Sequence, residues 1–227
     1  MEQKKKGFGA FLLLLMGYLL VFVFYTKIIL RLRDMPMQFS VMLQLIAYLV
    51  LGGLGMYLYR DELKAGLALW EAHTGKTLCL LLAAFMLDMV LSNLAAVPGS
   101  LLYPNYEAMN EHSVAELVGR FPALLLIVSL GIMGPVTEEV IFRLAPIGLT
   151  GKKHQKILMV FAAAALFMLV HMHAFTMEEL LSNLPHFATG LVYGFVLVIS
   201  GNATLPVVLH MMNNLPAMVV ATLSALG

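Results

Sequence analysis

The stretch FPALLLIVSLGIMGPVTEEVIFRLAPIGL, residues 121–149, decides the fold class, because it is long and apolar enough to cross a bilayer as a helix. It nevertheless contains three ionisable residues, Glu138, Glu139 and Arg143. An ionisable side chain at membrane depth costs about 2.5–3.5 kcal/mol on insertion scales, so three of them in one apolar segment are expected to have a use. The stretch therefore predicts both a membrane helix and the place of a functional site.

The composition of the whole chain indicates an integral membrane protein. Of its 227 residues, 61% are hydrophobic and only 12% are charged, and the mean hydropathy is +0.89, as expected for a chain in lipid. Seventeen methionines and thirteen phenylalanines fit a packed helical bundle, and the alternation typical of a membrane barrel is missing. A net charge of +1 gives no basis for nucleic-acid binding. We therefore expect an all-α, polytopic transmembrane bundle in contact with membrane lipids.

Seven apolar segments are candidates for membrane helices. They cover residues 8–29, 40–59, 77–97, 121–149, 157–174, 186–200 and 203–226. The first follows three lysines, but it is longer than a signal-peptide core and no small-residue cleavage site follows it, so we expect it to stay as a membrane helix. The chain then forms one membrane domain, residues 1–227, with N-terminal spans and an outer loop in 1–120 and four further helices in 121–227.

The basic residues predict the orientation of these helices. With the N-terminus in the cytoplasm, nine lysines and arginines fall on the inner side and four on the outer side, as the positive-inside rule requires. The inner set is Lys4, Lys5, Lys6, Arg60, Lys64, Lys76, Lys152, Lys153 and Lys156, and the outer set is Lys27, Arg31, Arg33 and Arg120.

The two adjacent glutamates are expected to have different roles. Glu139 and Arg143 are four residues apart, so on a helix they share a face and can form an ion pair. Glu138 is rotated from Glu139 by about 100° and is five residues from Arg143, so it is not the natural partner of the arginine. We expect Arg143 to hold Glu139 in a buried pair and Glu138 to face a cavity. Pro135, just upstream, is expected to open the helix locally.

Two later apolar segments carry polar residues that can reach the same site. His171 ends the run FMLVH, residues 167–171, and His210 and Asn214 are four residues apart on one helix face. At about 1.5 Å per residue, Glu138, His171 and His210 lie roughly 17, 21 and 10 Å from the inner ends of their helices. Since helix boundaries shift by about 2–4 residues, the three positions can meet in the inner half of the membrane.

The order of these motifs resembles a known family. Glu-Glu-x-x-x-Arg, Phe-x-x-x-His and His-x-x-x-Asn on successive apolar segments are similar to the motifs of the CAAX protease and bacteriocin-processing family (CPBP, also called ABI) of intramembrane proteases. All motif positions match between Glu138 and Asn214, whereas the first three spans resemble the family only in being hydrophobic. The resemblance implies an endopeptidase that acts on a membrane-associated peptide or protein, and we expect a bacterial cell membrane. Bacterial relatives are associated with peptide maturation, export of signalling peptides or self-immunity to bacteriocins.

The resemblance also implies the roles of the residues. Glu138, His171, His210 and Asn214 correspond to the catalytic positions, and Glu139 and Arg143 support the site. Glu138 and His171 suit the activation of a water molecule, and His210 and Asn214 suit donation to an oxyanion.

The cofactor stays open between none and one divalent metal such as zinc. Glu138, His171 and His210 also form a three-ligand set with an open position, as catalytic zinc prefers. No His-Glu-x-x-His motif is present, and we favour chemistry without a metal.

Two other function classes use the same residues. A non-enzymatic bacteriocin-immunity or scaffold protein of the same fold would keep the helices without catalysis. A proton-coupled transporter would use Glu138, Glu139, Asp88 and His171 as a relay, but the small size and the absence of a repeated half count against it.

Other notable residues are expected to have structural roles. His173 and Asn213 are expected to pack beside the site, and Asp88 to bond a polar group such as Asn93 or another helix in the core. Gly190 and Gly194, at GxxxG spacing, are expected to let two helices approach closely.

Overall fold

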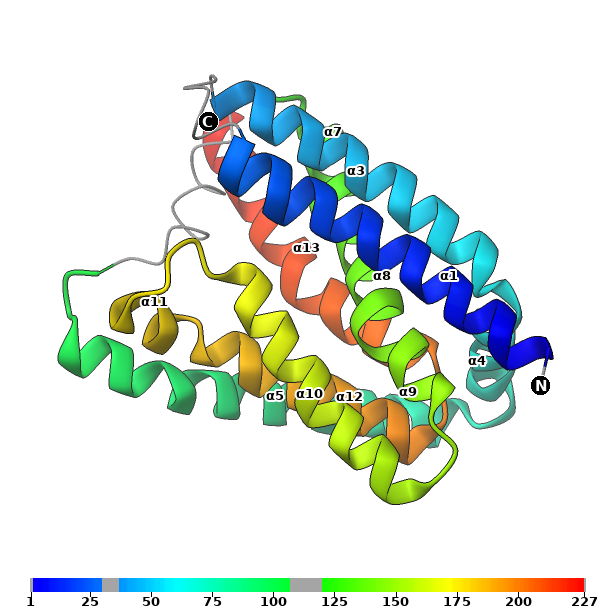
Figure 1. Ribbon diagram of the computed structural model, residues 1–227. Helices are drawn as coiled ribbons and strands as arrows, with labels where there is room; N and C mark the ends of the chain where they lie inside the picture. Colours follow the sequence, from blue (N-terminus) through cyan, green and yellow to red (C-terminus); the bar gives the residue numbers. More distant parts are fainter. Residues whose placement is uncertain (1, 30–36, 107–119, 227) are drawn as a thin grey trace.

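The computed structural model describes residues 2–29, 37–106 and 120–226, and the regular elements within these ranges are all helical (Figure 1). Six of the described helices are long and apolar enough to cross a membrane, and the apolar helix Thr204–Val220 is somewhat shorter. The predicted all-α, polytopic bundle is thus confirmed. The seven expected spans correspond to these six segments and the shorter helix.

The N-terminal part consists of α1 (Glu2–Tyr18), which continues as the π-helix η1 (Leu19–Ile29), and of α3 (Met37–Leu58), α4 (Arg60–Ala72) and α5 (Thr74–Leu102). The helices α1 and α3 lie side by side, and both also contact the central helix of the bundle (Figure 1).

Helix α4 was not expected from the sequence, which shows only a polar interruption there. Asp61 and Glu62 lie in its first turn, where negative charge favours helix formation. Near its end, the Trp70 indole N–H donates to Thr204 Oγ1 at 2.9 Å and attaches α4 to the start of α13 (Thr204–Leu226). This bond joins two segments that are far apart in the sequence and holds α4 at one end of the bundle.

Helix α5 is longer than the predicted span 77–97. It begins at Thr74 and continues through Pro98 to Leu102. Proline lacks a backbone N–H, but membrane helices tolerate it where neighbouring groups satisfy the freed carbonyl. The predicted end of this span at residue 97 is therefore wrong.

The central helix, residues 123–149, alternates between α- and π-helical turns. Its parts are α7 (Ala123–Leu126), η2 (Ile127–Met133), α8 (Gly134–Glu139), η3 (Val140–Leu144) and α9 (Ala145–Leu149). The Gly134 N–H donates to the Ser129 carbonyl, and the Ala145 N–H donates to the Val140 carbonyl. Each of these i to i−5 bonds lies directly before a proline, Pro135 or Pro146, which agrees with the expectation that Pro135 opens the helix.

The C-terminal part contains α10 (Lys153–His171), the short α11 (Met177–Ser182), α12 (Leu184–Ser200) and α13. Gly201 ends α12 in the left-handed conformation, with a φ of 64°, which glycine adopts without strain. Asn202 follows, and its Oδ1 accepts the Thr204 N–H at 2.9 Å at the start of α13. This three-residue connection, residues 201–203, reverses the chain, so that α12 and α13 pack against each other.

Helix α12 packs between α10 and α5, and the predicted close helix contact is confirmed at its glycines. A Cβ at Gly190 would lie 2.9 Å from Ala164 Cα, and a Cβ at Gly194 would lie 2.7 Å from a Val160 methyl. The central helix and α13 lie between the group of α5, α10 and α12 and the pair of α1 and α3 (Figure 1). The charged residues of the central helix are therefore enclosed by helices on both sides.

Candidate active site

Glu139 and Arg143 form the buried pair that their spacing predicts. Arg143 Nη1 lies 3.1 Å from Glu139 Oε1, and both side chains are only 1% exposed. The guanidinium also lies over the Phe167 ring, 4.1 Å from its centroid. His210 is a second partner that sequence spacing did not reveal, since its Nδ1 lies 2.9 Å from the same Glu139 oxygen. Because a carboxylate accepts, Nδ1 carries the proton, and Glu139 thereby fixes the orientation of the imidazole.

Glu138 occupies a different environment although it is the adjacent residue. Its Oε1 accepts hydrogen bonds from the hydroxyl groups of Tyr48, at 2.7 Å, and Tyr18, at 3.3 Å. Its Oε2 lies 3.7 Å from His210 Nε2, too far for a direct hydrogen bond. The residue is 4% exposed, and it lines a cavity. Glu138 therefore faces a cavity, as expected, and Arg143 does not pair with it.

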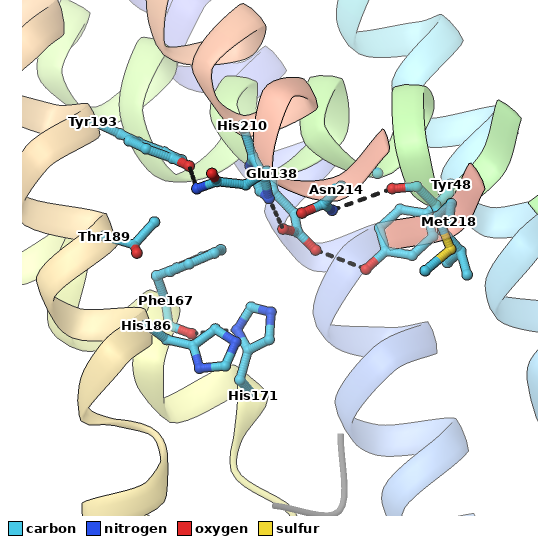
Figure 2. A pocket seen from close by; sticks show the side chains of 13 residues that line it. Tyr48, Glu138, Phe167, His171, His186, Thr189, Tyr193, His210, Asn214 and Met218 are labelled. Atoms are coloured by element: carbon cyan, nitrogen blue, oxygen red, sulfur yellow. Dashed lines mark hydrogen bonds and ion pairs between the residues drawn. The ribbon is translucent and has the colours of Figure 1, made fainter. Parts of the chain in front are cut away.

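This cavity has a volume of about 500 Å³ and is lined by residues of α3, the central helix, α10, α12 and α13; Figure 2 shows the lining side chains. Its polar lining includes all four residues expected to be catalytic. The four are Glu138, His171, His210 and Asn214, and the polar lining also includes His186 and Asn213. Glu139 and Arg143 do not line the cavity and lie behind it. The sequence prediction that the three motifs meet is consistent with this arrangement, whereas the predicted depth in the membrane stays a prediction.

His171 is the last residue of α10, and hydrogen bonds hold both its ring and the backbone on either side of it. Its Nδ1 lies 2.7 Å from the Phe167 carbonyl oxygen, so Nδ1 donates and Nε2 has a free lone pair. Lys27 Nζ donates to the carbonyls of Val170 and Met172, the second at 2.6 Å. A cation at the C-terminus of a helix is favourable. The first helix thus anchors the end of α10 that carries His171.

The segment after His171 is anchored by the buried Glu179. Its Oε2 accepts the His173 N–H at 3.1 Å, and its Oε1 accepts the Tyr106 hydroxyl at 2.8 Å. Burial, followed by this bond, raises the pKa of Tyr106 to about 12, so its hydroxyl remains a donor. His173 is not among the residues that line the cavity, and its packing beside the site stays a prediction.

His186 is a site residue that the sequence reasoning missed. Its ring stacks on His171, with centroids 4.3 Å apart and an interplanar angle of 22°, and it lines the same cavity (Figure 2). The sequence signal is weak, because a histidine in the first turn of an apolar segment looks like its polar boundary. The structure places it opposite His171 because α11 brings the start of α12 next to the end of α10.

Asp88 is bonded to other helices in the core, one of the two expected arrangements, and not to Asn93. Its Oδ2 accepts the Asn213 amide at 2.5 Å and the Tyr193 hydroxyl at 3.3 Å. Asn93 instead donates to the Met89 carbonyl. Asp88 is 1% exposed and therefore ties α5 to α12 and α13 beside the cavity.

Asn214 reaches the cavity from α13 while bonding the central helix. Its amide donates to the Leu130 carbonyl at 3.3 Å, and an amide group has a second N–H. Asn214 can therefore donate to a substrate oxygen without losing its own anchor.

The donor types that suit zinc are present, but they are not arranged around one point. Among the residues that the structure describes, no three His, Cys, Asp or Glu side chains are grouped as a metal site requires. His210 Nδ1 is already bonded to Glu139, and only its Nε2 faces Glu138. The set Glu138, His171 and His210 does not fit a metal as the side chains lie.

Comparison with known proteins gives one match. Residues 120–216 match the family model described as type II CAAX prenyl endopeptidase Rce1-like. The matched range contains all six motif residues and excludes α1, α3, α4 and α5. This confirms the resemblance predicted from the motifs and supports an intramembrane endopeptidase of the CAAX protease type. No curated protein and no solved structure matches the chain.

Proposed function

We propose that this chain, whose residues 120–216 match the Rce1-like CAAX endopeptidases, hydrolyses a peptide bond of a membrane-associated substrate in the Glu138 cavity. The observation that carries the proposal is the separation of two neighbouring carboxylates. Glu139 is closed off by Arg143 and His210, whereas Glu138 lines the cavity with His171, His210 and Asn214.

In the proposed mechanism, Glu138 is the general base and His171 helps to hold the water. The free Nε2 of His171 accepts a hydrogen bond from the water, and Glu138 takes its other proton as the water oxygen attacks the peptide carbon. The carbonyl electron pair moves onto oxygen. When the C–N bond breaks, the proton held by Glu138 passes to the leaving nitrogen, and an acid and an amine are released.

Asn214 and His210 are the proposed donors to the oxyanion. Asn214 donates through the amide hydrogen that Leu130 does not use. His210 would donate from Nε2 when both ring nitrogens carry a proton, because Nδ1 is bonded to Glu139 at 2.9 Å. Donors that are fixed before the reaction stabilise the developing charge without reorganisation.

The first test identifies the substrate and then measures the base. Peptides from cells with the wild-type protein and with Glu138→Ala are compared, and a peptide changed only by the wild type is the substrate. On that peptide, purified Glu138→Gln should lose about 10²–10⁴-fold in rate, the range for a general base. Glu71→Gln, an exposed glutamate on α4, is the matched control and should keep the rate. Full activity of Glu138→Gln on that peptide would show that Glu138 is not the base, whereas the absence of any peptide changed by the wild type would favour the immunity or scaffold class.

A second arm tests for a metal. Without a metal step, protein treated with a strong chelator should keep its activity, and His210→Ala should lower kcat by about 10²–10³-fold with little change in KM. Elemental analysis of wild type, His171→Ala and His210→Ala completes the arm. One tightly bound zinc per chain, lost in both variants, would replace this mechanism by a zinc mechanism.

A further inference from the structure

The carboxylate of Glu138 is held by two phenols that come from the N-terminal helices. Tyr18 lies at the end of α1 and Tyr48 lies in α3, and both hydroxyl groups donate to the same oxygen, Oε1. Neither residue is within the range 120–216 that matches the endopeptidase family. The other oxygen, Oε2, faces His210 without a direct hydrogen bond. The two oxygens of one carboxylate therefore have different surroundings.

We propose that Tyr48, assisted by Tyr18, is a positioning residue of the hydrolytic site, which fixes Oε1 of Glu138 so that Oε2 takes the proton from water. This inference rests on the proposed function, because it assigns the acting oxygen of the proposed base. It extends the site to helices that no motif covers.

Tyr48 is the stronger of the two donors. Its bond of 2.7 Å is typical of a hydroxyl bonded to a carboxylate, whereas the 3.3 Å of Tyr18 is long. Tyr48 also lines the cavity (Figure 2). The Tyr48 hydroxyl is therefore the group that sets the direction of the carboxylate.

The backbone of Tyr48 is fixed against the helix that carries Glu138. The Thr137 hydroxyl donates to the Met133 carbonyl at 2.7 Å and lies 3.3 Å from the Tyr48 carbonyl. One turn later, a Cβ at Gly52 would lie 3.0 Å from both the Met133 carbonyl and Thr137 Oγ1, so α3 and the central helix touch closely. Such contact holds the phenol at a constant distance from Glu138.

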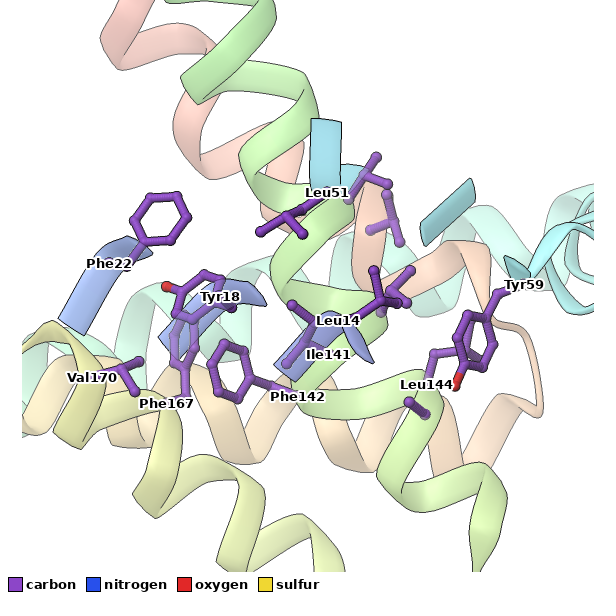
Figure 3. Packing of buried hydrophobic residues seen from close by; sticks show 14 of the residues in the cluster. Leu14, Tyr18, Phe22, Leu51, Tyr59, Ile141, Phe142, Leu144, Phe167 and Val170 are labelled. Carbon is purple, nitrogen blue, oxygen red and sulfur yellow. The ribbon is translucent and has the colours of Figure 1, made fainter. Parts of the chain in front are cut away.

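The ring of Tyr18 is fixed by aromatic packing. It stacks on Phe22 at 4.5 Å and meets the edge of Phe142 at 5.3 Å (Figure 3). Phe142 in turn contacts Phe167, four residues before His171 in α10. Tyr18 therefore lies in the same aromatic cluster that supports the histidine side of the site.

A phenol suits this task better than a cation. An arginine at Oε1 would favour the ionised carboxylate strongly and make it a poorer proton acceptor. The arginine of the motif pairs with Glu139 instead, and Glu138 receives neutral donors. Neutral donors orient the carboxylate with less loss of its ability to take a proton.

The test removes single hydroxyl groups in the full-length protein. Tyr48→Phe should lower kcat about 10–100-fold, since a small displacement of a catalytic group has effects of this size, and should leave KM within about twofold. Tyr18→Phe should have a smaller effect in the same direction. Tyr59→Phe is the matched control, because Tyr59 is also buried but donates to the Gly7 carbonyl away from the cavity, and it should keep the wild-type rate.

Rescue separates positioning from packing. Incorporation of 4-aminophenylalanine at position 48 restores an N–H donor at the same ring position and should recover most of the lost kcat. An unchanged rate in Tyr48→Phe, a loss that 4-aminophenylalanine does not recover, or a loss that follows the melting temperature would each overturn the inference. Glu138→Gln, measured in parallel, keeps the outcomes apart, because its full activity would show that Glu138 is not the base, whatever the Tyr48 variants do.

Discussion

At the scale of single residues, Glu138 and Glu139 are neighbours in the chain, yet their carboxylates have different hydrogen-bond partners. Glu139 is bonded to Arg143 and His210, and its side chain is 1% exposed. Glu138 accepts hydrogen bonds from two hydroxyl groups and faces the cavity. Successive side chains on a helix point about 100° apart, and this difference in direction is enough to give the two carboxylates different partners.

Arg143 is expected to be essential for stability. Arg143→Ala leaves Glu139 buried beside His210 alone, and breaking a buried ion pair costs roughly 3–5 kcal/mol. The variant should express poorly or melt well below the wild type, as measured by thermal unfolding in detergent. Arg60→Ala, at an exposed arginine, is the control, and Glu138→Gln should stay folded. Wild-type stability of Arg143→Ala would show that Glu139 does not depend on this partner.

Local spacing explains which residues of the site were predictable from the sequence. The Glu139–Arg143 pair follows from a separation of four residues within one helix, and His171, His210 and Asn214 follow from motif order. Tyr18, Tyr48 and His186 could not be found in this way. Their helices are apolar on nearly all sides, so the sequence does not show which face turns inward, and that rotation is set by packing between helices.

At the scale of elements, the contact between α10 and α12 brings His171 and His186 together. The helices approach closely because Gly190 and Gly194 face Ala164 and Val160. The sequence predicted this contact from the glycine spacing. It did not predict the π-helical turns before Pro135 and Pro146 or the helix α4, because these depend on backbone bonding and on contacts with distant segments.

Gly190→Ala is expected to destabilise the protein. Its Cβ would lie 2.9 Å from the backbone Cα of Ala164, so the helices must move apart, at a cost of about 1–3 kcal/mol. Gly53→Ala in α3 is the control, because a Cβ there has nothing within 4 Å, and a helical alanine is favoured by about 0.5–1 kcal/mol. Thermal melting should therefore move in opposite directions in the two variants. Equal melting temperatures would mean that the α10–α12 contact is loose.

At the scale of the whole molecule, the fold is a bundle whose N-terminal and C-terminal halves both build the site. The central helix contacts α3 on one side and α13 on another; Tyr18 of α1 contacts Glu138, and Lys27 of η1 contacts the end of α10. The division into N-terminal spans and catalytic helices, at residue 120, stays a prediction. The donors from α1 and α3 indicate that neither part forms the complete site alone.

The orientation of the bundle is predicted by its basic residues. We expect the N-terminus and residues 151–156 on the cytoplasmic side and the segment 98–120, in which Asn110 lies outside the described residues, on the other side. Cysteines introduced at Lys153 and Asn110 in a Cys79→Ser background should react from opposite sides of the membrane with an impermeant maleimide. Lys153 is exposed, as the assay requires. Labelling of position 110 from the cytoplasm would reverse the orientation.

The first helix also acts as a ruler. Tyr18 touches the proposed base, and Lys27, nine residues later on the same continuous helix, holds the end of α10 that carries His171. At roughly 1.5 Å per residue these two contacts are no more than about 13 Å apart along the helix axis. The first helix therefore sets the spacing between Glu138 and the end of α10 that carries His171. A single residue inserted between the two contacts would turn one of them away by roughly a quarter of a turn while the other stayed in place, so the length of this segment is expected to matter for the site.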